Sequence, residues 1–216
     1  MENRKGVLFD LDGTLVDTLG DLADATNTAL RNLGYPPCPE EAYPHMVGDG
    51  ARKLVERALG DACTPERAEQ VLTEFLRVYD AGCLRRTRPY EGIPELLDEL
   101  GRREIRLAVV TNKPHAQAVK IAAHYFGKSR FEFVLGGSPQ RKKKPDPTTV
   151  LEILRAWNMP AENALFVGDS DVDIYTAKNA GLRSAGAVWG FRGEEELRRA
   201  GADFLLQKPE NLLNLY

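Results

Sequence analysis

The spacing of hydrophobic residues follows two different patterns along the chain. Residues 7–9 form a short apolar run without a helical period, which predicts a buried strand of the kind found in parallel sheets. Between residues 18 and 85 no strand-like run occurs, and apolar residues recur at helical spacing over 19–33, 51–59 and a longer stretch that begins at Thr64. We therefore expect one short strand followed by an all-helical insert.

From Pro89 onward the pattern changes to strands that alternate with helices. Strands are expected at 105–110, 131–135, 164–167 and 185–189. Helices are expected at 93–100, 116–125, 148–157 and in a segment that ends at Gly181. This alternation predicts an α/β fold with a doubly wound, parallel, Rossmann-like sheet. We expect a core domain of residues 1–17 and 85–216, with a small helical domain of residues 18–84 inserted after the first strand.

The start of the insert carries a helix-capping signal. Thr18 has the residue type of an N-cap, and Asp21 follows it at close to the spacing of a capping box. Gly34 ends the apolar pattern, as a C-terminal glycine does. We therefore expect the first helix of the insert to begin directly after Thr18.

Composition and charge exclude several classes of protein. Hydrophobic residues make up 43% of the 216 residues and charged residues 28%, as in soluble globular proteins. The net charge of −3 offers no general attraction to nucleic acid or to an anionic membrane. No apolar run approaches the roughly 18 residues that span a bilayer, and the first strand begins too early for a signal peptide. Three cysteines without a Cys-x-x-Cys pair favour a reduced, cytoplasmic location.

Candidate chemistry begins at the end of the first strand. Asp10 and Asp12 follow the apolar run, and Gly13 allows a sharp turn directly after them. Ligands in open α/β sheets bind beyond the carboxyl ends of strands. The two acids suit a divalent cation, or a division of work into nucleophile and acid/base. An Asp-x-Asp pair alone is more often a turn that only caps a strand. The full string of residues 10–18 is far less common than such a pair, which favours a functional site here.

Two later segments offer groups that suit a phosphate. Thr111 and Asn112 end an expected strand, although a helix N-cap is the better interpretation of this pair taken alone. Residues 141–143 are a basic run of the kind found in solvated loops. Lys144 differs, because Pro145 and Pro147 fix the backbone around it; a rigidly held ammonium balances the charge of a carboxylate and a phosphoryl group.

A third acidic group follows the strand expected at 164–167. Asp169, Asp171 and Asp173 lie within five residues. Beside Asp10 and Asp12 they suit an oxygen-only site, which favours Mg²⁺ over metals that prefer histidine or cysteine. A calcium-binding loop is excluded, because its twelfth position needs a glutamate and residue 180 is alanine.

Together these segments resemble the haloacid dehalogenase-like hydrolases over essentially the whole chain. The four motifs of that family match Asp10-x-Asp12, Thr111, Lys144-Pro145 and Gly168-Asp169-x-x-x-Asp173. The resemblance implies that Asp10 is the nucleophile and Asp12 the acid/base. It also implies that Thr111 and the Asn112 backbone hold phosphoryl oxygens, and that Lys144 screens their charge.

For the metal, the resemblance implies Mg²⁺ bound by Asp10, the Asp12 backbone carbonyl and Asp169. Asp173 is expected to orient Lys144 or a metal-bound water. The helical insert matches the cap domain of the family, which closes over the site and reads the leaving group.

Within the family the chain is most similar to phosphoglycolate phosphatases. The similar stretches are 47–51 followed by 54–59, then 111–114, and then 136–137 ahead of 144–147. Gly48 and Gly50 flank a candidate cap loop that faces the substrate. Arg52 is expected to be a solvated cation rather than a carboxylate ligand. The three histidines are expected to be structural: His45, His115 and His124.

The sequence therefore predicts a Mg²⁺-dependent phosphomonoesterase that acts on a small phosphorylated metabolite, foremost 2-phosphoglycolate. The alternatives within the family are a sugar-phosphate mutase, a pyrophosphatase and a broad small-metabolite phosphatase. A phospho-acceptor signalling module would be shorter and would lack the helical insert, and an inactive binding protein would be expected to lack one of the motif residues. We expect no nucleic-acid or membrane partner, and a monomer or homodimer.

Overall fold

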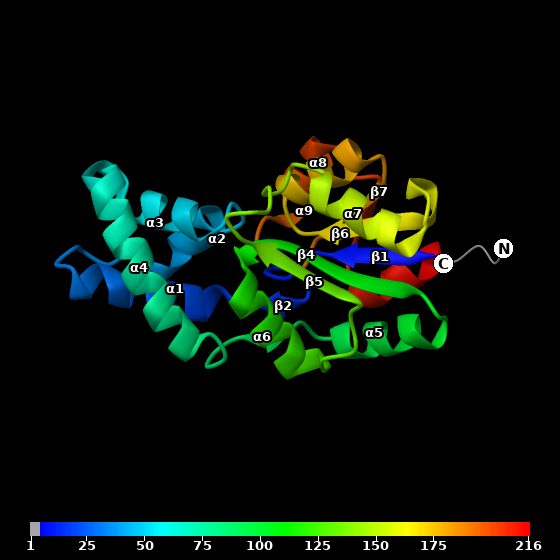
Figure 1. Ribbon diagram of the computed structural model, residues 1–216, viewed down its shortest axis with the longest axis horizontal. Helices are drawn as coiled ribbons and strands as arrows, with labels where there is room; N and C mark the ends of the chain where they lie inside the picture. Colours follow the sequence, from blue (N-terminus) through cyan, green and yellow to red (C-terminus); the bar gives the residue numbers. More distant parts are fainter. Residues whose placement is uncertain (1–4) are drawn as a thin grey trace.

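Six parallel strands form the sheet at the centre of this computed structural model, which describes residues 5–216 (Figure 1). The strand order is β5-β4-β1-β6-β7-β8, and each neighbouring pair is parallel. The strands are β1 (Gly6–Phe9), β4 (Arg106–Pro114), β5 (Phe133–Gly137), β6 (Ala164–Gly168), β7 (Arg183–Ala187) and β8 (Phe204–Leu206). The chain builds outward from β1 on one side and then returns to β6 on the other, which confirms the doubly wound α/β fold.

Alternating side chains of the central strands bury the two faces of the sheet against different helices. Val7 and Phe9 pack with α5 (Ile93–Arg102) and α6 (His115–Phe126), whereas Leu8 packs with α7 (Thr148–Trp157) and α8 (Asp171–Ala180). The remaining helix α9 (Gly193–Ala200) packs against α8 through Ile174 and Leu197. Burial on both faces explains why these strands read as continuous apolar runs.

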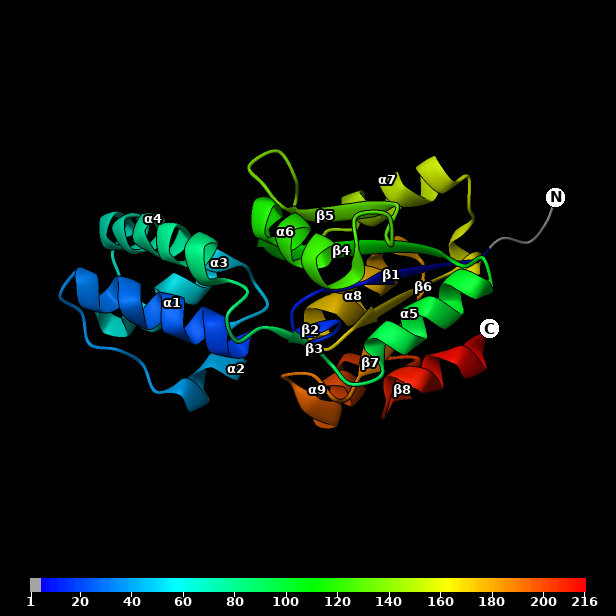
Figure 2. The ribbon, with the colours of Figure 1, turned by 90° about the horizontal axis from the view of Figure 1, so that it is seen from below.

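A bundle of helices lies beyond the carboxyl ends of the strands, as both ribbon views show (Figures 1 and 2). It consists of α1 (Leu19–Asn32), α2 (Tyr43–Met46), α3 (Ala51–Leu59) and α4 (Pro65–Gly82). Its interior holds fully buried side chains such as Leu30, Val55 and Val71, each of which contributes about 1.5–3 kcal/mol by leaving water. Helix α4 begins at Pro65, directly after Thr64, which caps it by accepting a hydrogen bond from the Arg67 N–H.

The chain enters and leaves this bundle through a short antiparallel pair, β2 (Val16–Asp17) and β3 (Arg88–Pro89). The buried carboxylate of Asp21 ties the two connections together. It accepts hydrogen bonds from the Arg86 N–H at 2.8 Å, the Thr87 N–H at 2.9 Å and the Thr87 hydroxyl at 2.7 Å. Because Asp21 is satisfied here, it is not available to close a capping box at Thr18.

The capping prediction for Thr18 is therefore wrong in its chemistry, although Thr18 does occupy the N-cap position of α1. The Thr18 hydroxyl donates to Asp12 Oδ1 at 2.8 Å, and the Leu19 N–H donates instead to Asp17 at 3.0 Å. Thr18 thus serves the end of the first strand rather than the helix that follows it.

Several expected element boundaries differ from those in the structure. The second core strand continues through Thr111 and Asn112 to Pro114, so these residues belong to β4 and the helix N-cap is Pro114. Strand β7 begins at Arg183, two residues before the expected start, and β8 was not anticipated. Short connections complete the fold: η1 (Glu40–Ala42), η2 (Gly60–Ala62), η3 (Ala161–Asn163) and η4 (Pro209–Leu215). Over residues 5–216, no helix has both the length and the apolar character that crossing a bilayer requires.

Candidate active site

The carboxyl ends of β1, β4 and β6 bring the predicted site residues to one edge of the sheet. Asp10 comes directly after β1, Thr111 lies in β4, and Asp169 comes directly after β6. The Asp10 N–H donates to the Val167 carbonyl at 2.9 Å, which fixes the end of β1 against β6. This is the point at which the strand order reverses, where α/β sheets bind their ligands.

A buried cation joins two of the predicted acids. Lys144 Nζ lies 2.8 Å from Asp10 Oδ1 and 2.6 Å from Asp173 Oδ1, and all three side chains are at least nine-tenths buried. The other oxygen of Asp173 accepts hydrogen bonds from the Ser170 N–H at 3.1 Å and the Ser170 hydroxyl at 2.7 Å. Asp173 is thereby fixed at the start of α8 and holds the lysine against Asp10.

Burial shifts the pKa values of these groups. Desolvation raises the pKa of Asp10 from 3.8 to about 6, with Lys144 opposing the shift and Asp173 adding to it. Desolvation also raises the pKa of Asp169 well above its usual value, and the charges of Asp173 and Asp10 raise it further. Burial alone would lower the pKa of Lys144, but the neighbouring carboxylates outweigh it and hold the lysine charged.

The donor atoms around Asp169 fit a divalent cation. Carboxylate oxygens of Asp10, Asp169 and Asp173 lie within 4.8 Å of one another, and all three residues are buried. Lys144 Nζ is the ion-pair partner of Asp10 Oδ1. Burial raises the pKa values of Asp10 and Asp169, which favours additional positive charge at this cluster, and an all-oxygen donor set suits a hard cation.

Two glycines, Gly13 and Gly190, allow the side chain of Asp169 to approach the backbone closely. A Cβ atom on Gly13 would lie 2.2 Å from Asp169 Oδ2, and one on Gly190 would lie 2.2 Å from Asp169 Cβ. The Phe191 N–H donates to Asp169 Oδ2 at 2.8 Å. The loop after β7 therefore sets the position of a carboxylate that directly follows β6.

The side chain of Asn112, rather than only its backbone, organises the site. Its Oδ1 accepts a hydrogen bond from the Lys144 N–H at 2.9 Å, and its Nδ2 donates to the Lys144 carbonyl at 3.2 Å. Nδ2 also donates to the Gly48 carbonyl at 3.1 Å. Asn112 thus connects β4, the lysine loop and the predicted cap loop.

The predicted cap loop lies against the site. Gly48 and Gly50 have φ values of +113° and +88°, which favour glycine. A Cβ on Gly50 would approach the Asn112 carbonyl to 3.0 Å and Lys143 Nζ to 3.3 Å. Arg192, from the loop after β7, donates to the Val47 carbonyl at 2.8 Å and closes the other side of the loop.

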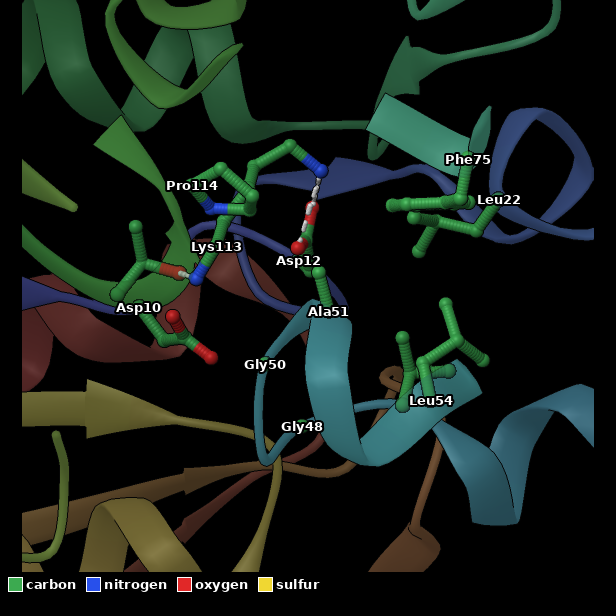
Figure 3. A pocket seen from close by; sticks show the side chains of 12 residues that line it. Asp10, Asp12, Leu22, Gly48, Gly50, Ala51, Leu54, Phe75, Lys113 and Pro114 are labelled. Carbon is green, nitrogen blue, oxygen red and sulfur yellow. Dashed lines mark hydrogen bonds and ion pairs between the residues drawn. The ribbon is translucent and has the colours of Figure 1, made fainter. Parts of the chain in front are cut away.

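Sequence reasoning missed Lys113. Its ammonium is buried and lies 2.8 Å and 3.1 Å from the two oxygens of Asp12 (Figure 3). It also donates to the Tyr79 hydroxyl and lies 4.7 Å from the centroid of that ring. A signal existed, since Thr111 and Lys113 are two residues apart and side chains at that spacing on a strand share a face.

A pocket lies between the strand ends and the helical bundle, and Asp10, Asp12, Thr111 and Lys113 are among its lining residues (Figure 3). The core contributes the polar residues and the bundle contributes apolar ones. The lining residues are Asp10, Asp12, Leu22, Val47, Gly48, Gly50, Ala51, Leu54, Phe75, Thr111, Lys113 and Pro114. The Thr111 hydroxyl accepts a hydrogen bond from the Lys113 N–H at 3.2 Å. A hydroxyl that accepts can also donate, so Thr111 can donate to an oxygen of a bound ligand.

Other candidates lie outside the pocket. Arg52 is exposed and pairs with Glu69, in line with the expected solvated cation. His115 accepts a hydrogen bond from the Gly136 N–H at 3.3 Å, and His45 contacts Arg192. The ring of His124 packs edge-on against Tyr125.

Comparison with known proteins supplies the family. The sequence profile described as haloacid dehalogenase-like hydrolase matches residues 7–187. The chain belongs to the haloacid dehalogenase-like hydrolase family. It is 38% identical to the phosphoglycolate phosphatase of Aquifex aeolicus over 97% of this chain and 95% of that protein. It is 35% identical to the phosphoglycolate phosphatase of Vibrio cholerae over 100% of this chain and 98% of that one.

Solved structures of similar proteins agree with the fold. A predicted phosphoglycolate phosphatase from Haemophilus somnus superimposes with a TM-score of 0.90 at 28% identity, covering 100% of this chain and 99% of that chain. CbbY from Rhodobacter sphaeroides, solved with xylulose-(1,5)bisphosphate, superimposes with a TM-score of 0.82 at 27% identity, covering 97% of this chain and 96% of that chain.

Proposed function

We propose that this hydrolase is a Mg²⁺-dependent phosphomonoesterase that converts 2-phosphoglycolate and water to glycolate and phosphate. One observation carries the proposal: a buried carboxylate, Asp10, lines the same pocket as Thr111 and is paired with the buried ammonium of Lys144. A nucleophile, a phosphoryl-binding hydroxyl and a charge-balancing ammonium are what phosphoryl transfer to a carboxylate requires. The likeness to phosphoglycolate phosphatases over nearly the whole chain supports the substrate.

In this proposal the residues at the strand ends divide the work. Asp10 attacks phosphorus and the bond to the leaving oxygen breaks, which gives an aspartyl phosphate. Asp12 donates a proton to the leaving alkoxide, and later takes one from the water that hydrolyses the intermediate. Thr111 and the Asn112 backbone bind phosphoryl oxygens, and Lys144 balances the charge that gathers between them and Asp10.

The residues that would hold Mg²⁺ are Asp10, the backbone carbonyl of Asp12 and Asp169. A bound Mg²⁺ would supply positive charge that brings a carboxylate and a phosphoryl group together despite their repulsion. Asp173 keeps Lys144 in place, as its 2.6 Å ion pair supports. The raised pKa values of Asp10 and Asp169 fit this assignment, because a divalent cation offsets the cost of burying both charges.

The division into two domains belongs to the same proposal. In it residues 1–17 and 85–216 belong to the core, with residues 1–4 outside the part of the chain that the structure describes, and residues 18–84 belong to a cap that covers the reacting groups. Leu22, Leu54 and Phe75 from α1, α3 and α4 line the pocket on the side of the cap, where apolar side chains lower the polarity around the reacting groups. The carboxylate of Asp21 ties the two connections between these parts, which suits a hinge.

The test is phosphate release in the presence of Mg²⁺ from a panel of 2-phosphoglycolate, sugar phosphates, nucleotides and pyrophosphate. We expect a clear preference for 2-phosphoglycolate in the wild type and its loss in Asp10→Asn. Activity that depends on Asp10 but favours a sugar phosphate would retain the mechanism and reject the substrate. Release that survives in Asp10→Asn would reject the mechanism.

A further inference from the structure

The pocket is uneven in polarity, and this unevenness restricts what the leaving group can be. The side chains that the helical bundle places in it are hydrocarbon: Leu22, Val47, Ala51, Leu54 and Phe75. None of them forms hydrogen bonds with its side chain, so a leaving group with several hydroxyls would find few partners there. The charged lining residues are two acids, Asp10 and Asp12, and one cation.

That cation is Lys113. No other lysine or arginine lines this pocket within the part of the chain that the structure describes. Arg52, the residue that sequence reasoning considered for a carboxylate, is paired with Glu69 on the exposed surface. Lys143 lies over Gly50 at the edge of the cap loop, outside the pocket lining.

The environment of Lys113 holds it at the boundary between the reacting groups and the apolar wall. On one side its ammonium contacts both oxygens of Asp12, and on the other it contacts the hydroxyl of Tyr79 in α4. Tyr79 stacks on Phe75, with ring centroids 5.3 Å apart, and Phe75 belongs to the apolar wall. An ammonium has three donors. All three face acceptors here, the two Asp12 oxygens and the Tyr79 hydroxyl, so an anion in the pocket would share the ammonium with Asp12 by replacing its longer contact of 3.1 Å.

We propose that Lys113 is a specificity-determining residue that binds an anionic group, foremost a carboxylate, on the leaving group. This inference rests on the proposed function and deepens it. An anion that enters a pocket with apolar walls and two carboxylates meets repulsion and pays for desolvation, unless a cation is already in place. Lys113 is held ready by Asp12 and Tyr79, so little ordering is needed when the anion arrives. A neutral leaving group gains nothing from it.

The experiment compares kcat/KM for two matched esters, 2-phosphoglycolate and its neutral amide, phosphoglycolamide. The variants are Lys113→Met, which keeps the length and removes the charge, and Lys113→Arg, which keeps a charge. Lys143→Met serves as the matched control, because it removes an exposed lysine near the pocket mouth. Thermal unfolding of each variant checks that it is folded.

We expect the wild type to prefer the acid over the amide, and Lys113→Met to reduce that preference by at least about 30-fold. Lys113→Arg should retain more of the preference than Lys113→Met, and Lys143→Met should retain it fully. Rates that fall equally for both esters in Lys113→Met would overturn the inference, since Lys113 would then act only through Asp12. Equal rates for the two esters in the wild type would also overturn it.

Product binding gives an independent readout that needs no catalysis. Calorimetry should find tighter binding of glycolate than of glycolamide to the wild-type protein, and weaker glycolate binding to Lys113→Met. Glycolate that binds no better than glycolamide to the wild type would overturn the inference even where Lys113→Met does not fold. The proposed function fails differently, through absence of Asp10-dependent phosphate release.

Discussion

The side-chain amide of Asn112 forms two hydrogen bonds with the backbone of Lys144, accepting from its N–H at 2.9 Å and donating to its carbonyl at 3.2 Å. The same amide nitrogen donates to the Gly48 carbonyl at 3.1 Å. One buried side chain therefore sets the backbone position of the lysine that pairs with Asp10 and fixes the loop that covers the pocket.

We expect Asn112→Ala to misplace Lys144. The loss of these hydrogen bonds leaves buried backbone groups unpaired, which should lower the free energy of unfolding by about 1–3 kcal/mol. Because a shift of about 1 Å in a positioned group costs on the order of 100-fold in rate, kcat should fall by about that factor. Urea denaturation and steady-state kinetics measure the two effects.

Asn179→Ala is the matched control for this variant. The Asn179 side chain donates to the Pro145 carbonyl at 2.9 Å, so it also contacts the lysine loop, but from the exposed side. Its effect should stay within about 0.5 kcal/mol. Equal losses in the two variants would mean that the loop needs general support and not the amide of Asn112.

The affinity for Mg²⁺ should fall as the pH is lowered. Metal binding requires ionised carboxylates, and the pKa of Asp10 is raised to about 6, with that of Asp169 also raised. Below about pH 6 protons therefore compete with the metal. Titration calorimetry should show an affinity that drops about tenfold per pH unit for each bound proton, with proton release on binding. Constant affinity between pH 7.5 and 5 would contradict the assigned ligands, and Asp169→Asn should abolish binding at every pH.

Gly190→Ala should disturb Asp169 without removing any polar group. The added Cβ would lie 2.2 Å from Asp169 Cβ and 2.4 Å from the Gly13 carbonyl oxygen, so the loop or the carboxylate must move. We expect a loss of about 1–3 kcal/mol in the free energy of unfolding and at least about a tenfold weaker Mg²⁺ affinity. In the control Gly82→Ala the nearest heavy atom lies 3.7 Å from the added Cβ. Gly82 lies in helix α4, where alanine is more favourable than glycine. Unchanged metal binding in Gly190→Ala would show that the loop after β7 does not set the position of Asp169.

Much of the fold was predictable because the strands that carry it are buried on both faces. The apolar runs of β1 and β6 contrast clearly with the helical periods around them. The boundary of β4 was not predictable, because Thr111, Asn112 and Lys113 are polar and yet continue the strand. Strand β8 has only three residues and pairs with one neighbour. Three residues are too few to show the alternation of apolar and polar positions that predicts a strand.

The residues of the candidate site likewise include some that the sequence could predict and some that it could not. Asp10 and Asp169 follow directly from strand ends, and sequence spacing was enough to find them. Lys113 and the side chain of Asn112 gain their roles from residues far away in the chain: Lys113 meets Tyr79 of the bundle, and Asn112 meets Gly48. The spacing of Lys113 from Thr111 indicates the face of the strand on which it lies. The partners of Lys113 and Asn112 could not be predicted, since both contacts depend on how the helical bundle lies against the sheet.

Asp10→Asn should stabilise the metal-free protein at neutral pH while it abolishes activity. The pKa of Asp10 is raised from 3.8 to about 6, so between these values the folded state binds more protons than the unfolded state. The free energy of unfolding therefore falls as the pH rises through this window, and the penalty is complete above about pH 6. At about 1.4 kcal/mol per pKa unit it amounts to roughly 3 kcal/mol, which Asp10→Asn removes at pH 7.5 but not at pH 4. Urea denaturation with a metal chelator measures this, and saturating Mg²⁺ should reverse the order by favouring the wild type.

The exposed control Asp61→Asn should show no such change. A metal-free Asp10→Asn protein less stable than the wild type at pH 7.5 would mean that the ion pair with Lys144 outweighs the cost of burying the charge.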